Sequence, residues 1–370
     1  MIDRDEFSAW LRLLDTPGVG REAARALLAR FGSPEAVIGA STSARAAVVP
    51  QATAAALTTV PDTFEARLAA GWQWLQQGAE PRDAIAIGDA RYPKALLESP
   101  DPPLLLYARG RIELLHAAVI AIVGSRNPTP QGLENARAFA AHLSGAGWTV
   151  VSGLALGIDG AAHEGALAAG GTTIAVVGTG LDIDYPTRHR ALAQKIASTG
   201  LVLSEFSIGT PALAANFPVR NRIIAGLARG TLVVEAAVQS GSLITARLAA
   251  EAGREVFAIP GSIHSPLARG CHALIKQGAK LVDSAADIVE ELAPLQAHPS
   301  VVGSARASSD SAVSKDPVLD ALGFDPIGID ALVARTGRSA SELAARLLDL
   351  ELQGRVARLP GQQYQRLERA

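Results

Sequence analysis

Six short apolar runs alternate with longer helical segments between residues 83 and 292, and this alternation restricts the fold more than any other feature of the chain. The runs are 117–123, 148–151, 173–177, 201–203, 231–234 and 256–259. Near-continuous apolar strands are typical of a parallel sheet covered on both faces, because such strands bury the side chains of both sides. Strands separated by helices also favour parallel pairing through crossover connections. The sequence therefore predicts a doubly wound α/β domain over residues 83–292.

The residues before this domain have a different pattern. Residues 1–80 read as short helices, with a break at Thr16-Pro-Gly-Val-Gly20 and an alanine-rich stretch that ends near residue 75. The break and the apolar helix after it look like a helix–hairpin–helix unit, whose turn can present backbone N–H groups to a phosphate. The same residues also make an ordinary corner between two helices, and the sequence leaves both interpretations open.

The residues after the α/β domain divide into a linker and a small unit. Residues 294–316 are rich in Ser, Ala and Val, a composition typical of a flexible linker. Residues 317–370 then contain two predicted helices and two predicted strands, at 327–335, 339–353, 355–359 and 363–367. Helices followed by a hairpin predict a winged helix.

The second of these helices has the wrong charge for reading a DNA groove. It carries Glu342, Asp349 and Glu351, with Arg346 as its one basic residue. Nucleic-acid affinity depends on cations that neutralise phosphates. The C-terminal unit is therefore predicted to be a protein-interaction or regulatory module.

Composition narrows the class of protein. The chain has 370 residues, of which 48% are hydrophobic and 19% charged, as in folded α/β proteins and unlike disordered chains. Its single cysteine, Cys271, excludes a disulfide framework, and together with the absence of a secretory signal it predicts a cytoplasmic protein. No apolar run approaches the ~20 residues that a membrane span needs. With a formal net charge of −2, any nucleic-acid site must concentrate positive charge locally.

One predicted helix that leads into an apolar strand carries the densest group of functional candidates. Arg220, Asn221 and Arg222 are predicted in its first turn, with Pro218 starting the helix and Phe217 just ahead. Free backbone N–H groups and the positive end of the helix dipole favour an anion there. A ring beside two guanidinium groups suits a ligand that carries both a phosphate and a base. The alternative is that the ring belongs to the core and that the arginines pair with acidic neighbours.

Glycines, hydroxyls and a further arginine follow the predicted strands. Gly124-Ser-Arg126 follows the first strand, Ser152-Gly153 the second, and Ser240-Gly241-Ser242 comes after the fifth. Parallel sheets bind ligands beyond the carboxyl ends of their strands, where these groups can form a phosphate cradle. The last of the three segments can also cap the next helix, and the two roles use the same geometry.

Other polar residues favour structural roles. Asp159 and His163 lie four residues apart on one helix face, but no third ligand accompanies them, which favours a helix-start aspartate and a buried histidine over a metal or acid–base site. Asp182, Asp184 and Tyr185 are predicted to shape a turn. No Walker A sequence, nucleophile elbow or paired-cysteine metal spacing is present, and the first βα loop lacks the glycine pattern of an ordinary NAD site. We therefore expect no catalytic residue, metal or cofactor.

Taken in order, these motifs resemble the DprA/Smf family of bacterial DNA-processing proteins. The matching segments are 124–126, 152–159, 178–186, 217–222, 240–247 and 256–261. The resemblance is dense over roughly residues 85–292 and extends less specifically to both flanking regions. It implies an extended Rossmann-like sheet, a helical N-terminal domain that is SAM-like or helix–hairpin–helix-like, and a winged-helix-like C-terminal domain.

The resemblance implies a protein without catalytic turnover that binds single-stranded DNA, protects incoming strands in natural transformation and loads RecA onto them. It also implies that the protein acts as a homodimer and helps to displace single-strand-binding protein. The implied DNA contacts are Arg126, Ser152, Gly153, Phe217, Arg220, Asn221, Arg222, Ser240, Gly241 and Ser242. By residue type, arginines neutralise phosphates, Ser and Gly N–H groups hold the backbone, and Phe217 stacks on a base.

Two positions depart from the family pattern, and two other functions compete with it. Gln131 stands where an aromatic residue is often found, so one stacking platform is absent, and His189 replaces a more usual Asn. One rival is a Rossmann-like hydrolase of the N-glycosidic bond of nucleoside monophosphates, but its Pro-Gly-Gly-x-Gly-Thr signature is not met by Glu235 and the Ser-Gly-Ser segment after it. The other is a transcriptional regulator that reads duplex DNA, which the acidic C-terminal helix disfavours.

Overall fold

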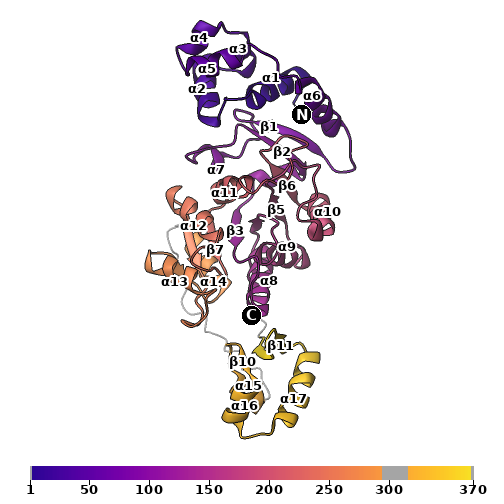
Figure 1. Ribbon diagram of the computed structural model, residues 1–370, viewed down its shortest axis with the longest axis vertical. Helices are drawn as coiled ribbons and strands as arrows, with labels where there is room; N and C mark the ends of the chain where they lie inside the picture. The colour runs from indigo at the N-terminus through magenta and orange to yellow at the C-terminus, as the bar shows by residue number, and fades with distance from the viewer. Residues whose placement is uncertain (1, 294–315, 368–370) are drawn as a thin grey trace, which may run out of the picture.

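The computed structural model describes residues 2–293 and 316–367, so the predicted linker 294–316 lies outside the described residues except for Asp316. Three parts follow one another along the chain: a helical unit, a large sheet covered by helices, and a small unit of helices and strands (Figure 1). No helix in the described ranges has the length and apolar character that crossing a membrane would require.

The N-terminal unit is helical, and the break predicted within it is a tight corner. Its helices are α1 (Arg4–Asp15), α2 (Arg21–Phe31), α3 (Pro34–Gly39), α4 (Thr42–Ala46), α5 (Gln51–Ala56) and α6 (Phe64–Gln76). Between α1 and α2 the Val19 N–H donates to the Thr16 carbonyl, and Gly18 adopts a φ of +82°, which glycine tolerates without strain. The corner joins packed helices, and a phosphate contact at this turn stays a prediction.

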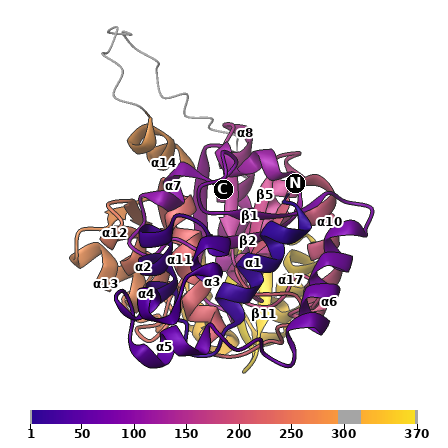
Figure 2. The ribbon, with the colours of Figure 1, turned by 90° about the horizontal axis from the view of Figure 1, so that it is seen from above.

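The helical unit packs on the sheet through aromatic side chains. Phe7 of α1 and Trp74 of α6 lie edge-on to the fully buried Tyr107, with ring centroids 6.2 and 6.3 Å away. Figures 1 and 2 show these helices beside strands β1 and β2, which form one margin of the sheet. The helical unit therefore shares a core with the sheet.

The predicted parallel sheet is confirmed. The six predicted strands are β3 (Val119–Val123), β4 (Thr149–Ser152), β5 (Thr173–Val176), β6 (Leu201–Ser204), β7 (Gly230–Val233) and β8 (Glu255–Ala258). All neighbours among them pair in parallel. Within the described residues the sheet has the order β1-β2-β6-β5-β4-β3-β7-β8-β9.

Three strands of this sheet were not predicted: β1 (Arg82–Ala86), β2 (Leu105–Gly110) and β9 (Lys280–Leu281). β2 pairs antiparallel with both β1 and β6, and so extends the parallel sheet toward the helical unit. β9 is two exposed residues long and carries no apolar pattern that a sequence could reveal. Among the described residues, the sheet thus contains three strands more than the six apolar runs indicated.

Alternating side chains of β3 show how both faces are covered. Ile120 and Ile122 pack on one face with α8 (Pro130–Gly145) and α9 (Ile158–Ala168), whereas Ala121 and Val123 pack on the other face. That second face holds α11 (Asn216–Leu227) and α12 (Ser242–Glu251). The remaining helical segments of this region are α7 (Lys94–Leu97), η1 (Ile112–His116), η2 (Thr187–His189), α10 (Arg190–Thr199), α13 (Arg269–Lys276) and α14 (Ala285–Leu292).

The strand order creates a switch point beside β3. The chain proceeds from β3 outward through β4, β5 and β6, and then returns to place β7 on the opposite side of β3. The helices that follow β3 and β7 cover opposite faces, so the loops leading to them separate. A crevice at such a point is where doubly wound sheets bind ligands.

The C-terminal unit has the element order of a winged helix, as predicted. It contains α15 (Pro317–Leu322), β10 (Ile327–Gly328), α16 (Ile329–Thr336), α17 (Ala340–Leu352), β11 (Val356–Leu359) and β12 (Gln363–Arg366), with sheet order β10-β12-β11. A capping box of Ser339 and Glu342 starts α17. The first predicted helix begins at Ile329 rather than at 327, because residues 327–328 pair with β12.

Candidate nucleic-acid interface

A pocket of about 690 Å³ opens at the switch point, between the loops that follow β3 and β7. Ligand sites for small molecules and nucleotides fall in this range of volumes. Of the ten predicted contact residues, the following line the pocket: Arg126, Phe217, Arg220, Asn221, Ser240, Gly241 and Ser242. Ser152, Gly153 and Arg222 do not line it.

Two aromatic rings and an arginine form one side of the pocket. The Phe217 and Tyr185 ring centroids lie 5.3 Å apart with an angle of 32° between the planes. The Cζ atom of Arg126 lies over the Phe217 ring, 5.7 Å from its centroid. Phe217 is half-buried, whereas Tyr185 is 44% exposed and Arg126 is exposed. This side of the pocket can therefore offer a ring face and a cation to one ligand.

Tyr185 is a site residue that the sequence did not single out. It was predicted only to shape a turn, yet it stacks beside Phe217 and lines the pocket. The available signal was its place after the third predicted strand, at the same sheet edge as the other candidates. Because aromatic residues make up only 4% of the chain, an aromatic at that edge was informative.

Arg220 is a buried cation at the pocket lining. Its Nη2 donates to the Gly153 carbonyl at 2.8 Å and lies 4.0 Å from the Asp159 carboxylate. Its Nε has no hydrogen-bond partner among the described residues. Burial lowers the pKa of Arg220 to about 10, against the opposing effect of Asp159. The residue thus stays charged at neutral pH, and it brings a positive charge to the pocket lining.

The helix dipole does not act on Arg220 in the way predicted. α11 begins at Asn216, so Phe217 and Pro218 lie inside its first turn and Arg220 lies in the second. The positive end of a helix dipole acts mainly within the first turn. The prediction of an arginine pair in the first turn is therefore wrong, and Arg220 owes its place to the residues that surround its guanidinium group.

Gly153 and Ser152 support the site from behind. A Cβ atom on Gly153 would lie 1.6 Å from Arg220 Nη1, so the arginine can pack there only because the residue is glycine. The Gly153 N–H donates to Asp159 Oδ2 at 3.1 Å and is not free for a phosphate. Ser152 is fully buried, and its Oγ donates to the Ile122 carbonyl at 2.7 Å. Both residues therefore lie in the scaffold behind the pocket lining, and a direct DNA contact from either stays a prediction.

Asp159 lies beneath the pocket and organises the loop after β4. Its Oδ2 accepts hydrogen bonds from the Gly153 and Ala155 N–H groups, at 3.1 and 3.3 Å. Burial raises its pKa, although Arg220 and these N–H groups oppose the rise. The sequence treated Asp159 as a helix-start residue only, but it lines the pocket and faces Arg220.

His163 is a buried structural residue. Its Nδ1 lies 2.7 Å from Thr173 Oγ1, and burial lowers its pKa to about 3. It does not line the pocket with Asp159. In the described part of the chain no group of three His, Cys, Asp or Glu side chains could hold a metal ion. The predicted reading of a buried histidine agrees with these contacts.

The segment Ser240–Ser242 lies at the start of α12, where most of its hydrogen bonds are local. Ser240 and Ser242 share a hydrogen bond between their hydroxyls at 2.7 Å, and the Ser242 N–H donates to Ser240 Oγ at 3.3 Å. The Ser240 N–H donates to the Ala237 carbonyl. Asn221 reaches across from α11 to the Gly241 carbonyl at 3.4 Å. The segment therefore does not present a full row of free N–H groups. What it offers to a ligand is its hydroxyl groups and the exposed backbone of Gly241.

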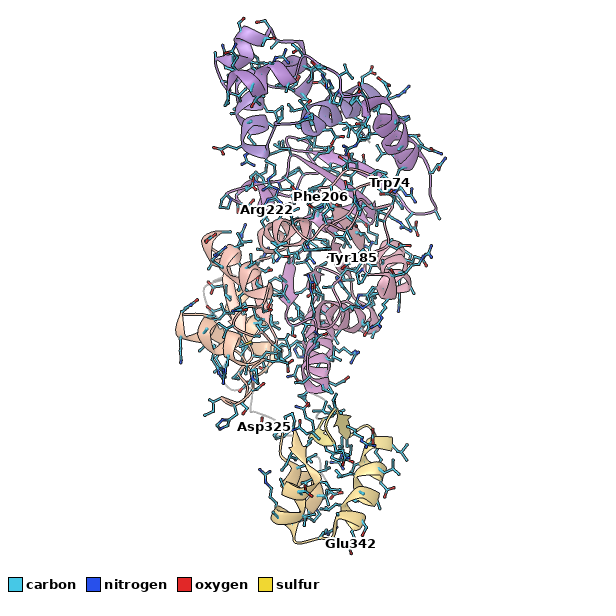
Figure 3. All side chains as sticks on the ribbon, in the orientation of Figure 1. Trp74, Tyr185, Phe206, Arg222, Asp325 and Glu342 are labelled. Atoms are coloured by element: carbon cyan, nitrogen blue, oxygen red, sulfur yellow. The ribbon has the colours of Figure 1, made fainter. Side chains whose placement is uncertain are left out.

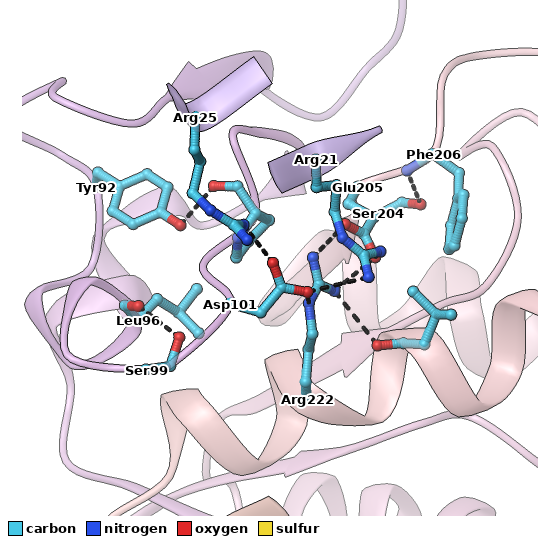
Figure 4. A network of polar contacts seen from close by, with 12 residues as sticks. Arg21, Arg25, Tyr92, Leu96, Ser99, Asp101, Ser204, Glu205, Phe206 and Arg222 are labelled. Carbon is cyan, nitrogen blue, oxygen red and sulfur yellow. Dashed lines mark hydrogen bonds and ion pairs between the residues drawn. The ribbon is translucent and has the colours of Figure 1, made fainter. Parts of the chain in front are cut away.

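Arg222 does not line the pocket and instead belongs to a network of ion pairs with Asp101, Glu205 and α2 (Figures 3 and 4). Its Nε donates to Asp101 at 2.8 Å, and both terminal nitrogens donate to Glu205 at 2.6 Å. Arg21 and Arg25 of α2 also pair with Asp101. Although burial opposes it, Arg222 and Arg25 hold the pKa of Asp101 below its ordinary value.

The sequence left open whether the two arginines bind an anion or pair with acidic neighbours, and their contacts differ. Arg222 pairs with acidic neighbours, as the alternative reading proposed, whereas Arg220 lines the pocket. The side chain of Arg222 is only 10% exposed and its guanidinium group is saturated by two carboxylates. It therefore links α11 to the helical unit through Asp101, which also pairs with Arg21 and Arg25, and a phosphate contact from Arg222 stays a prediction.

Comparison with known proteins connects this geometry to a family. Residues 83–293 match the model of DNA recombination-mediator protein A, and residues 303–362 match the DprA winged helix domain. The chain is 43% identical to protein Smf of Escherichia coli over 303 residues, which cover 80% of each protein. It is 50% identical to DNA processing protein DprA of Streptococcus pneumoniae over 208 residues, 56% of this chain and 73% of that protein.

Two solved structures share the fold. The X-ray structure of DprA from Streptococcus pneumoniae aligns with a TM-score of 0.68 and 38% identity, covering 79% of this chain and 98% of the other. A structure of DNA processing protein A from Helicobacter pylori, described for its single-stranded DNA binding mode, aligns with a TM-score of 0.52 and 31% identity. That alignment covers 57% of this chain and 95% of the other.

Proposed function

Because this chain belongs to the DprA/Smf family of DNA-processing proteins, we propose that it binds single-stranded DNA in the pocket at the switch point and does so without catalysis. One observation carries the proposal: the pocket combines a buried arginine, an exposed arginine and two partly exposed rings at one sheet edge. Cations track a phosphate backbone and rings stack on bases of any sequence, which is how proteins hold single strands.

The chemistry divides between the two sides of the pocket. Arg126 and Arg220 supply positive charge for phosphates, within a chain whose net charge is −2. Phe217 and Tyr185 supply stacking surface, which a duplex with its bases paired inside cannot use. The hydroxyls of Ser240 and Ser242, which bond to each other in the free protein, can also donate hydrogen bonds to the DNA backbone. The proposal is therefore a preference for single strands with little preference for sequence.

The wider role follows the family's description as a recombination mediator. We propose that the protein protects incoming single strands in natural transformation, loads RecA onto them and helps to displace single-strand-binding protein. We also propose that it acts as a homodimer in the cytoplasm. The support for these roles is the family match over residues 83–293, and no residue is assigned to either protein interface.

The hydrolase alternative finds no support in the pocket. Glu235, the residue closest to its signature, does not line the pocket and accepts two hydrogen bonds from Thr129. Among the residues that line the pocket, Asp159 is the one acidic residue, and it already accepts from two backbone N–H groups. Neither carboxylate is placed to act as a free general base.

Fluorescence anisotropy with matched single- and double-stranded oligonucleotides across a salt series tests the proposal. Wild type should prefer the single strand, and Phe217→Ala should weaken that binding, whereas Phe324→Ala, which removes an exposed ring on the C-terminal unit, should not. Equal binding of both forms, or none, would contradict the proposal. In that case release of a free base from nucleoside monophosphates is the assay that decides for the hydrolase.

A further inference from the structure

Glu235 follows β7 and is a partly buried carboxylate that the proposed function does not use. Its Oε2 accepts from the Thr129 N–H at 2.9 Å, and its Oε1 accepts from the Thr129 hydroxyl at 2.6 Å. Its backbone carbonyl accepts from the Ser125 N–H at 2.7 Å. One residue of β7's loop thus holds two residues of the loop after β3.

These bonds lie on both sides of Arg126. Ser125 precedes it and Thr129 follows it by three residues, so the loop that carries the arginine is fixed at both ends by Glu235. Thr129 also caps α8, because its Oγ1 accepts from the Gly132 N–H at 3.0 Å. The loop is therefore anchored to the sheet edge and to the start of α8 at once.

The packing around the carboxylate is specific. A Cβ atom on Gly132 would lie 2.5 Å from Glu235 Cδ, so the first turn of α8 leaves room for the carboxylate only because it contains glycine there. Burial raises the pKa of Glu235, and the two hydrogen bonds from Thr129 oppose that rise. Hydrogen bonds to an ionised carboxylate are stronger than bonds between neutral groups, which suits an anchor.

Arg126 needs such an anchor because its side chain is exposed. It lies over Phe217, and the described residues give it no ion pair. A long exposed side chain loses conformational freedom when it binds a ligand, and a rigid backbone beneath it reduces that loss. The pairing of Glu235 with Thr129 supplies this rigidity across the switch point.

We infer that Glu235 is a positioning residue for single-stranded DNA binding, which holds the 124–129 loop so that Arg126 meets a phosphate beside Phe217. The inference rests on the proposed function and assigns Glu235 no contact with DNA. The hydrolase reading would instead require this carboxylate to face the ligand. Glu235→Gln separates the two readings, because glutamine can still accept a hydrogen bond from Thr129 but cannot act as a general base.

Salt-series anisotropy with a single-stranded oligonucleotide tests the inference in four proteins: wild type, Glu235→Ala, Arg126→Ala and the double variant. Glu235→Ala should weaken binding about tenfold, as expected when one charge-assisted contact loses its geometry. The slope of log affinity against log salt should fall by about 0.7, one phosphate contact on a single strand. In the Arg126→Ala background the same change should have no further effect. Equal losses in both backgrounds would overturn the inference.

Two conservative variants separate positioning from folding. Glu235→Gln can still accept from the Thr129 N–H and should retain most of the affinity, and Thr129→Ser, which keeps both the hydroxyl bonded to Glu235 and the cap of α8, should bind like wild type. Amide hydrogen exchange in the free protein gives a readout that does not depend on DNA. The Thr129 amide should lose protection in Glu235→Ala while the Ser125 amide, which donates to a backbone carbonyl, keeps it. An unchanged Thr129 amide would overturn the inference even if no strand binds, whereas failure of wild type to bind DNA would overturn the proposed function alone.

Discussion

Arg220 and Arg222 lie two residues apart on α11 and serve opposite sides of that helix. Arg220 donates to the Gly153 carbonyl beside the pocket, whereas Arg222 is held by Glu205 and Asp101 beneath the helical unit. Residues two apart on a helix are separated by about 200° around its axis, so their side chains cannot share a ligand. One helix thus joins the candidate DNA site to the N-terminal unit.

Replacing each arginine separately should give different defects. Arg220→Ala should weaken single-stranded DNA binding and reduce its salt dependence, because a cation is lost from the pocket. Arg222→Ala should leave the salt slope unchanged but lower the free energy of unfolding by about 3 kcal/mol, since it leaves Glu205 with only the longer pair to Arg21, at 3.8 Å. Anisotropy and denaturant unfolding measure the two effects. Arg111→Ala, at an exposed pair with Glu113, is the matched control. A reduced salt slope in Arg222→Ala with a normal unfolding free energy would contradict this assignment.

Phe217→Ala should reduce affinity for single strands by about 1–3 kcal/mol, the range for stacking of one base on an aromatic ring. The salt slope should stay as in wild type, because no charge is removed. Phe217→Tyr keeps a ring in place and should bind nearly as well as wild type. If alanine and tyrosine weaken binding equally, stacking is not the function of this ring.

Gly153→Ala should impair binding although residue 153 does not line the pocket. The added Cβ would lie 1.6 Å from Arg220 Nη1, so the guanidinium group must leave its place. Anisotropy should show a loss similar to that of Arg220→Ala, and combining the two changes should add little. Gly145→Ala at the end of α8 is the matched control, because a Cβ atom there meets nothing within 4 Å and the residue does not line the pocket. Wild-type affinity in Gly153→Ala would show that Arg220 does not need this position.

Acidification should destabilise the protein through His163. Its pKa is lowered to about 3 in the folded state from 6.5, so the unfolded chain binds the extra proton between these values and stability falls as the pH drops through that window. The slope approaches about 1.4 kcal/mol per pH unit for one proton. Denaturant unfolding of wild type and His163→Gln at pH 7, 6 and 5 measures it. The variant should lose less stability on acidification than wild type, and parallel curves would exclude His163 as the cause.

Much of the fold follows from local pattern. The six apolar runs from 117 to 259 are the strands β3 to β8, because buried parallel strands need apolar residues on both faces. The strands β1 and β2 were not predicted; they pair antiparallel at the margin of the sheet, and Tyr107 of β2 packs against Phe7, 100 positions away in the chain. The helix starting at Asn216 was placed two residues late, since Pro218 is tolerated anywhere in the first turn.

The candidate site was predictable in its residue types and less so in its contacts. Arg126 and Ser240 were named from the loops that follow strands, and Phe217 from the start of a helix; the pocket gathers them because parallel strands end at one sheet edge. Ser152 and Gly153 belong to the same edge but turn inward, and no local pattern distinguishes them from exposed neighbours. Tyr185 was missed because its role depends on the ring of Phe217, which belongs to helix α11.

The sequence by itself determined the doubly wound sheet, the winged helix and the loops that carry the candidate site, because periodicity and glycine placement act over a few neighbouring residues. Only the tertiary structure decided that Arg220 lines the pocket while Arg222 braces the helical unit, and that Glu235 anchors the loop of Arg126. Those outcomes depend on which acids and carbonyl groups lie within hydrogen-bond reach after folding. Partners such as Asp101 and Arg222 are 121 positions apart, and no local pattern in the chain pairs them.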